Sequence, residues 1–234
     1  MDKHLKKTSL LNYDAPTITA MIDARNWQNL SEKNKILLSY NFVRDDIAFG
    51  YNADDAIPAS QVLRDGYGQC NTKGILFMAL LRALGIPCRM HGFTIDKLLQ
   101  KGAMTGITYF FAPKDIVHSW VEVFYKNRWY NFEGFILDME YLNNLQVKFA
   151  HYTGNFCGYG VATPDLKKPP VYWDENNTYI QRDGIVKDFG VFESPDDLFA
   201  LHSQRLSAFK RLVYRNISRH AMNRNIKKIR QGDC

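Results

Sequence analysis

The sequence predicts an α+β protein, because a buried helix is followed by strands and further helices stand at both ends of the chain. Residues 70–84 are apolar on nearly all sides and stop at Gly85, with Pro87 after it, as expected of a buried helix. Residues 118–125 alternate between polar and apolar side chains, which is typical of a strand with one face in a core. At 234 residues, the chain has the length of one globular domain, so residues 1–234 are expected to form a single unit.

Two helices are expected before the buried helix. Apolar side chains recur at helical spacing in residues 17–46 on both sides of a break near residues 26–31. Ser31 has the side chain of a helix N-cap and stands just before the second helical stretch.

The strands that follow the buried helix include a β-hairpin. Cys88 to Thr94 reads as one strand, and residues 118–125 and 128–132 read as two more that are joined by Lys126-Asn127. A two-residue loop places Tyr125 opposite Arg128 in an antiparallel pair. The buried helix is expected to pack on this antiparallel sheet.

Two segments lie beyond the hairpin. Residues 141–195 contain many glycines and prolines and are expected to be a loop-rich extension. Residues 196–230 combine apolar side chains at near-helical spacing with basic residues, which predicts one long basic amphipathic helix.

The charge of the chain is concentrated at its C-terminal end. Residues 201–234 hold nine basic residues and one acidic residue, whereas the whole chain has a net charge of +6. An amphipathic helix with a solvated basic face explains this pattern better than a nucleic-acid site does. No signal peptide or apolar run long enough for a membrane span is present, so the prediction is a cytoplasmic protein with no membrane span.

Cys70 is the candidate nucleophile among four cysteines. It begins the buried helix, where free N–H groups and the helix dipole lower the pKa of a thiol. Gly66 and Gly68 precede it and allow a close approach of the backbone. The other cysteines, at positions 88, 157 and 234, have no comparable setting, and no spacing suggests zinc.

His118 is the candidate base, and the hairpin register selects its partner. A thiolate needs an imidazole, which in turn needs a polar group to orient it. In the register of a two-residue loop, Asn131 and Glu133 lie on the face of His118, with Glu133 as its diagonal neighbour. Glu133 is the preferred orienting residue, Asn131 the alternative, and Asp138 a weaker third candidate.

Further residues near the predicted site have open roles. Gln61, Arg64 or Gln69 could add an oxyanion donor beside the backbone N–H of Cys70, and spacing does not choose among them. Trp120 shares the predicted face of His118 and is a candidate wall of the cleft.

Three motifs in order resemble the transglutaminase-like superfamily, which has a papain-like fold. Gly68-Gln-Cys70, continuing through Gly85-Ile-Pro87, resembles its nucleophile helix and following strand. His118-Ser-Trp-Val-Glu-Val resembles its His strand, and Arg128-Trp-Tyr-Asn-Phe-Glu133 its acid strand. The resemblance covers roughly residues 36–138. It departs from the family at Glu133, where the family usually has Asp.

The resemblance implies a cysteine-dependent hydrolase or acyltransferase that acts on an amide bond through a Cys70-His118-Glu133 triad and a thioester. Peptidase, deamidase and transglutaminase reactions all fit, with hydrolysis slightly preferred. The expected partner is a protein or peptide substrate, with no cofactor and no metal. The alternative is an inactive transglutaminase-like module that binds a protein or nucleic acid. The sequence says nothing about oligomeric state.

Overall fold

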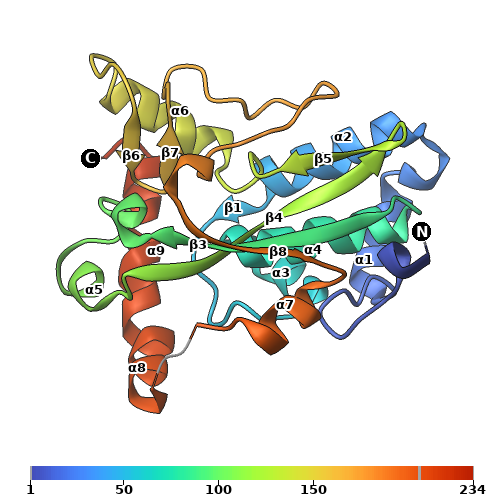
Figure 1. The fold of residues 1–234 in the computed structure, drawn as a ribbon, viewed down its shortest axis with the longest axis horizontal. Helices are drawn as coiled ribbons and strands as arrows, with labels where there is room; N and C mark the ends of the chain where they lie inside the picture. Colours follow the sequence, from blue (N-terminus) through green and yellow to red (C-terminus); the bar gives the residue numbers. More distant parts are fainter. Residues whose placement is uncertain (1, 205–206, 234) are drawn as a thin grey trace.

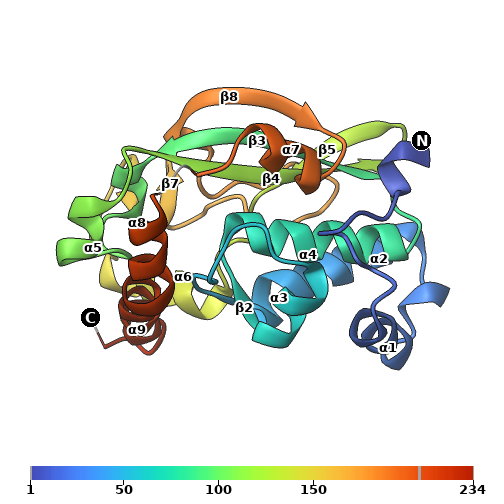
Figure 2. The same cartoon turned by 90° about the horizontal axis from the view of Figure 1, so that it is seen from below.

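A four-stranded antiparallel sheet carries the fold and packs against a central helix. The computed structural model describes residues 2–204 and 207–233. The sheet has the strand order β5-β4-β3-β8, and helix α4 lies against one of its faces (Figures 1 and 2). Its strands are β3 (Cys88–Asp96), β4 (Asp115–Tyr125), β5 (Arg128–Phe132) and β8 (Ile185–Phe192).

Helices flank this sheet at both ends of the chain (Figure 1). The α-helices are α1 (Pro16–Ala24), α2 (Glu32–Asn41), α3 (Ala59–Asp65), α4 (Cys70–Ala83), α5 (Gly106–Phe111), α6 (Met139–Lys148), α7 (Pro195–Leu201), α8 (Ala208–Val213) and α9 (Arg219–Arg230). The α+β fold class is confirmed.

Helix α4 is buried along nearly its whole length because its apolar residues face neighbours on every side. The hydroxyl of Thr72 accepts a hydrogen bond from the backbone N–H of Gln69 at 3.0 Å and so fixes the start of the helix. The helix ends before Gly85, which has a φ of 78°, a conformation that glycine adopts without strain. The predicted buried helix is confirmed.

The hairpin of β4 and β5 has the predicted register. Lys126 and Asn127 form the two-residue loop and have φ angles of 48° and 61°, as a tight hairpin turn with left-handed residues requires. Tyr125 pairs with Arg128, and Val121 pairs with Phe132. The pairing of β4 and β5 therefore has the register that a two-residue loop predicts.

The two N-terminal helices are also confirmed. Ser31 precedes α2, and its side chain accepts a hydrogen bond from the backbone N–H of Asn34 at 3.4 Å. After α2, the short strand β1 (Ala48–Phe49) pairs in parallel with β2 (Tyr67–Gly68), the strand that leads directly into α4. This pairing positions the residue that begins α4.

The segment expected to be loop-rich holds more structure than the sequence predicts. It contains most of α6, the small hairpin of β6 (Phe156–Gly158) and β7 (Val161–Thr163), and β8. β8 pairs with β3 at the edge of the main sheet, with irregular register between Gly92 and Phe93. An edge strand with few buried side chains has a weak sequence pattern, which explains why β8 is not predicted.

The predicted single helix over residues 196–230 is wrong. Helix α7 ends at Leu201, and Ser207 caps the start of α8 by accepting a hydrogen bond from the N–H of Lys210 at 3.3 Å. Helix α8 continues through a π-helical turn (Tyr214–Ser218) into α9. The amphipathic pattern is real in α9, since it buries Met222, Ile226 and Ile229. In the described part of the chain, no helix has the length and apolar character needed to cross a membrane.

Candidate functional site

Cys70 is the first residue of α4 and lies in the wall of a cavity of about 700 Å³. Its side chain is largely buried, with 9% of the residue exposed. Gly68 makes this placement possible, because a Cβ there would lie 2.6 Å from the hydroxyl oxygen of Thr72 and 2.9 Å from a side-chain carbon of Lys73. The side chains of Thr72 and Lys73 thus leave no room for a Cβ at this glycine.

The start of α4 is tied to the strand that carries His118. The side-chain amide of Asn71 donates to the carbonyl oxygen of Val117 at 3.1 Å, and the hydroxyl of Ser119 donates to Oδ1 of Asn71 at 2.9 Å. These bonds hold the residues on both sides of His118 against the residue that follows Cys70. The segment of β4 that carries His118 is therefore held at the start of α4 by buried hydrogen bonds.

The thiol of Cys70 differs electrostatically from the prediction. Burial raises its pKa well above the ordinary value, and the charge of Asp55 raises it further. The backbone N–H groups of Asn71 and Ser119 hydrogen-bond to the sulfur and lower the pKa, but by less. The N–H groups at the helix start lower the pKa of Cys70 as predicted, but desolvation outweighs them, so the net shift is upward.

His118 and Glu133 form a completely buried pair. Both residues have no exposed surface, and Nε2 of His118 lies 3.1 Å from Oε1 of Glu133. Among the described residues, Nδ1 of His118 has no hydrogen-bond partner. With Nε2–H donating to Glu133, Nδ1 carries the free lone pair of a neutral imidazole and can accept a proton.

Glu133 is itself held in place by a segment far away in the sequence. Its Oε2 accepts hydrogen bonds from the backbone N–H groups of Ile180, Gln181 and Arg182 at 2.9, 2.8 and 3.0 Å. Three N–H donors on one oxygen leave the other oxygen to orient the imidazole. These donors come from the segment expected to be loop-rich, and no side-chain pattern marks them in the sequence.

The two alternative orienting residues lie elsewhere. The side-chain amide of Asn131 donates to the hydroxyl of Tyr179 at 2.7 Å. Asp138 caps α6 by accepting from the N–H of Tyr141, and it forms an ion pair with Arg230 at 2.6 Å. Of the three candidates, Glu133 is the residue that the structure places on His118.

Of the three candidate oxyanion donors, one lies beside Cys70 and two lie elsewhere. Gln69 lines the cavity with Cys70, and its Nε2 donates to Oδ1 of Asp55 at 2.9 Å. Gln61 points its amide at Asp65, at 2.6 Å, and accepts from Arg64, so these two residues form a surface network on α3. Gln61 and Arg64 do not line the cavity that contains the thiol.

Trp120 does not wall the cavity, contrary to the prediction. Its ring packs against His91 and Phe93, with centroid distances of 4.8 Å to each, in a small apolar cluster on the sheet face opposite α4. The alternation of β4 places Trp120 on the same face as His118, but Phe93 and its neighbours cover that face along its length.

The cavity beside Cys70 is built from distant parts of the chain. Its walls come from the segment around β1, the start of α4, the region of α5 and the start of β4, and the C-terminal segment. In Figure 2, α8 and α5 stand on the same side of the molecule, next to the end of the sheet. Asp55 and its neighbour Asp54 lie in this wall, although no motif in the sequence marks them.

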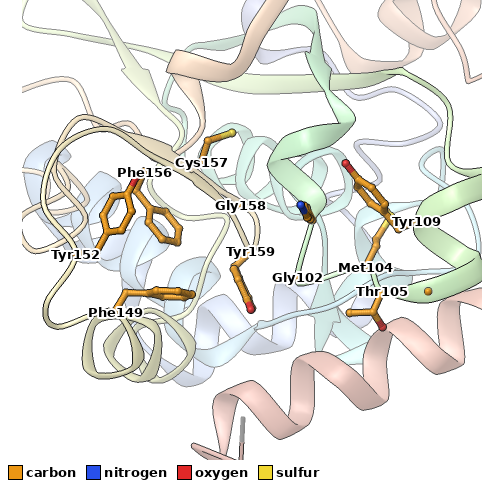
Figure 3. A pocket seen from close by; sticks show the side chains of 12 residues that line it. Gly102, Met104, Thr105, Tyr109, Phe149, Tyr152, Phe156, Cys157, Gly158 and Tyr159 are labelled. Carbon is orange, nitrogen blue, oxygen red and sulfur yellow. The ribbon is translucent and has the colours of Figure 1, made fainter.

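A second cavity, of about 510 Å³, lies apart from the thiol. Figure 3 shows its aromatic lining, formed by Tyr109, Phe149, Tyr152, Phe156 and Tyr159. None of the candidate catalytic side chains lines it. Met104 lines both cavities.

Comparison with known proteins bears on this arrangement. Residues 23–134 match the family model of the transglutaminase-like superfamily, and this range contains Cys70, His118 and Glu133. The resemblance stated from the motifs is thereby confirmed, and the match begins earlier than residue 36.

One solved structure also resembles the chain. It is that of an inferred cysteine protease from Cytophaga hutchinsonii, with 14% identity and a TM-score of 0.47. The similarity covers 83% of this chain and 47% of that chain, so this chain spans about half the length of that protein. No curated protein sequence matches significantly.

Proposed function

Since residues 23–134 match the family model of the transglutaminase-like superfamily, we propose that the protein is a cysteine-dependent enzyme that breaks an amide bond. In this proposal Cys70 is the nucleophile, His118 is the base, and Glu133 is a positioning residue. The observation that supports it best is the imidazole of His118, which is fully buried and hydrogen-bonded to Glu133 through Nε2, with Nδ1 left free to accept a proton.

The proposed reaction proceeds through a thioester. Sγ of Cys70 attacks the amide carbonyl while Nδ1 of His118 takes the thiol proton. The backbone N–H of Cys70, at the start of α4, stabilises the oxyanion. The imidazolium then gives its proton to the leaving amine, and water attacks the thioester in the same way to release a carboxylic acid and the free thiol.

The raised pKa of Cys70 indicates how the proton moves. Burial raises the pKa of Cys70 and so disfavours its thiolate in the resting protein. The base must therefore remove the proton as the sulfur attacks, so the rate should depend strongly on His118. A preformed thiolate–imidazolium pair is not part of this proposal.

Alkylation of individual thiols tests the proposal before any substrate is known. We expect iodoacetamide at pH 7 to modify Cys70 at least about tenfold more slowly in His118→Ala than in the unmodified protein, because the base is lost. Cys88 is the internal control. It is fully buried, and burial raises the pKa of its thiol to about 11, but its sulfur hydrogen-bonds to the carbonyl of Met78 and not to an imidazole. Peptide mass spectrometry would follow both thiols, and equal slow labelling in both proteins would contradict the proposal.

Water is the acceptor that we propose, and a peptide library distinguishes it from an amine. Hydrolysis gives cleaved or deamidated peptides, whereas transfer in the presence of an added primary amine gives amide adducts. Cys70→Ala is the matched control for both products. A library left unchanged by the protein, together with unselective alkylation, would instead support the inactive binding module.

A further inference from the structure

A carboxylate that the proposed mechanism does not use lies beside Cys70. Asp55 stands in the loop between β1 and α3, is partly buried, and lines the same cavity as the thiol. Nε2 of Gln69, the residue immediately before Cys70, donates to its Oδ1 at 2.9 Å. Asp55 is thus held at the start of α4 by the backbone neighbour of the nucleophile.

Among the residues that the structure describes, Asp55 is not in ion-pair contact with a cation, although the charge of His118 lowers its pKa to a smaller extent than burial raises it. Its hydrogen-bond donors are the side-chain amides of Gln69 and Asn71. Within residues 2–204 and 207–233, no ion pair includes Asp55. Lys210 and Arg211 of α8 line the same cavity but do not pair with it. Burial raises the pKa of Asp55, as expected for a carboxylate that gives up water without gaining a full counter-charge.

The negative charge of Asp55 also disfavours the reaction proposed for Cys70. A negative charge near the sulfur disfavours the thiolate that forms during attack, and Asp55 raises the pKa of Cys70. In a catalytic site this charge slows the attack by sulfur unless a bound molecule neutralises the carboxylate. A cation in the cavity next to Asp55 would remove the opposition and would itself be held by an incompletely compensated charge.

We propose that the substrate carries a cationic group, such as the ammonium of a lysine side chain, that pairs with Asp55 while Cys70 attacks the adjacent amide. Pairing then favours transfer of the thiol proton to His118 only when the correct substrate is bound. The catalytic meaning of this inference rests on the proposed function, but the charge preference of the site can be measured without it.

Charged thiol reagents measure that preference directly in the full chain. The probes are the cationic 2-aminoethyl methanethiosulfonate and the anionic 2-sulfonatoethyl methanethiosulfonate, which form the same type of disulfide with Cys70. The measured quantity is the ratio of the two modification rates at Cys70, followed by peptide mass spectrometry. We expect Asp55→Asn to lower the ratio of cationic to anionic rate about tenfold, which corresponds to a loss of about 1.4 kcal/mol of selective attraction.

Asp54→Asn is the matched control. It removes the same charge one residue earlier, from an exposed side chain in the same cavity wall, and should change the ratio less than twofold because water and salt screen it. A ratio that is unchanged in Asp55→Asn, or lowered equally by both variants, would overturn the proposal. Asp55→Ser is a second variant in case the asparagine disturbs Gln69.

His118→Ala separates this inference from the proposed function. It should slow both reagents alike and leave their ratio unchanged. If His118→Ala changes neither rate, the catalytic role of His118 fails while the charge preference of the site stands. If Asp55→Asn leaves the rate ratio unchanged but His118→Ala slows both reagents, the charge preference fails while the catalytic role stands. In the peptide library, Lys or Arg should stand next to the amide that is cleaved or deamidated. Asp55→Asn should lose this preference. Absence of the preference in the unmodified protein would also overturn the proposal.

Discussion

Two carboxylates beside the candidate nucleophile are held in opposite ways. Glu133 is fully buried, and its two oxygens accept four hydrogen bonds, one of them from His118. Asp55 is only partly buried, faces a cavity, and has amide donors but no cation. A carboxylate with every acceptor position filled is part of the framework, whereas one left incompletely compensated in a cavity wall is available to a ligand.

The largest expected effect of this difference is on stability. Glu133→Ala should lower the free energy of unfolding by about 3–5 kcal/mol, because three backbone N–H groups and the imidazole of His118 lose their acceptor in a buried place. Urea denaturation measures the loss. The control is Asp54→Ala at an exposed position, which should change stability by less than about 0.5 kcal/mol. A loss below about 1 kcal/mol for Glu133→Ala would show that these hydrogen bonds do not hold the framework.

The next effect is on the reactivity of the thiol. Glu133→Gln keeps the shape of the side chain but removes the charge that stabilises the imidazolium, so we expect Cys70 to react with an amide electrophile about 100-fold more slowly. Rates are to be compared at a temperature where circular dichroism shows both proteins folded. If the glutamine variant retains the original rate, Glu133 is structural and does not position a base.

A smaller effect concerns the pH dependence of stability. Burial raises the pKa of Asp55, so its ionisation costs folding free energy, and the cost appears as pH rises above the ordinary carboxyl value of 3.8. Asp55→Asn has no such cost. Relative to the unmodified protein, its free energy of unfolding should therefore increase between pH 3.8 and neutral pH. Urea denaturation at a series of pH values measures the difference, and a difference that decreases with pH would contradict the raised pKa.

The smallest effect is expected at Asn131, the alternative orienting residue. Its side chain hydrogen-bonds to Tyr179 and not to His118, so Asn131→Ala should change the reaction rate of Cys70 less than threefold and stability by about 1 kcal/mol. The same thiol assay applies. A rate loss as large as that of Glu133→Gln would transfer the positioning role to the amide.

The parts of the site that sequence predicts correctly are those set by local pattern. Helix α4 follows from its apolar residues and its glycine stop, and the hairpin register follows from Lys126-Asn127. Together these place Glu133 near His118 without any knowledge of the rest of the fold. Alternation along a strand and the length of a turn are properties of neighbouring residues, so the sequence expresses them directly.

The parts that sequence does not predict depend on contacts between distant segments. The donors to Glu133 are backbone N–H groups 47 to 49 residues away, and backbone groups leave no trace in the side-chain pattern. Asp55 lies in a loop, and only the fold brings it to Cys70. The pKa of Cys70 could not be predicted from the helix start alone, because it depends on how deeply the folded chain buries the sulfur.

The hydrogen bonds from the backbone of residues 180–182 to Glu133 determine how much of the chain this site requires. The family match stops at residue 134, yet Oε2 of Glu133 accepts its three hydrogen bonds from backbone N–H groups beyond that residue. A fragment cut at the family boundary would contain the cysteine, the histidine and the glutamate but would leave the glutamate without three of its partners. The smallest piece of this chain that can keep Glu133 fully hydrogen-bonded therefore extends at least to Arg182, and moving Glu133 and His118 into another scaffold would require moving that distant backbone as well.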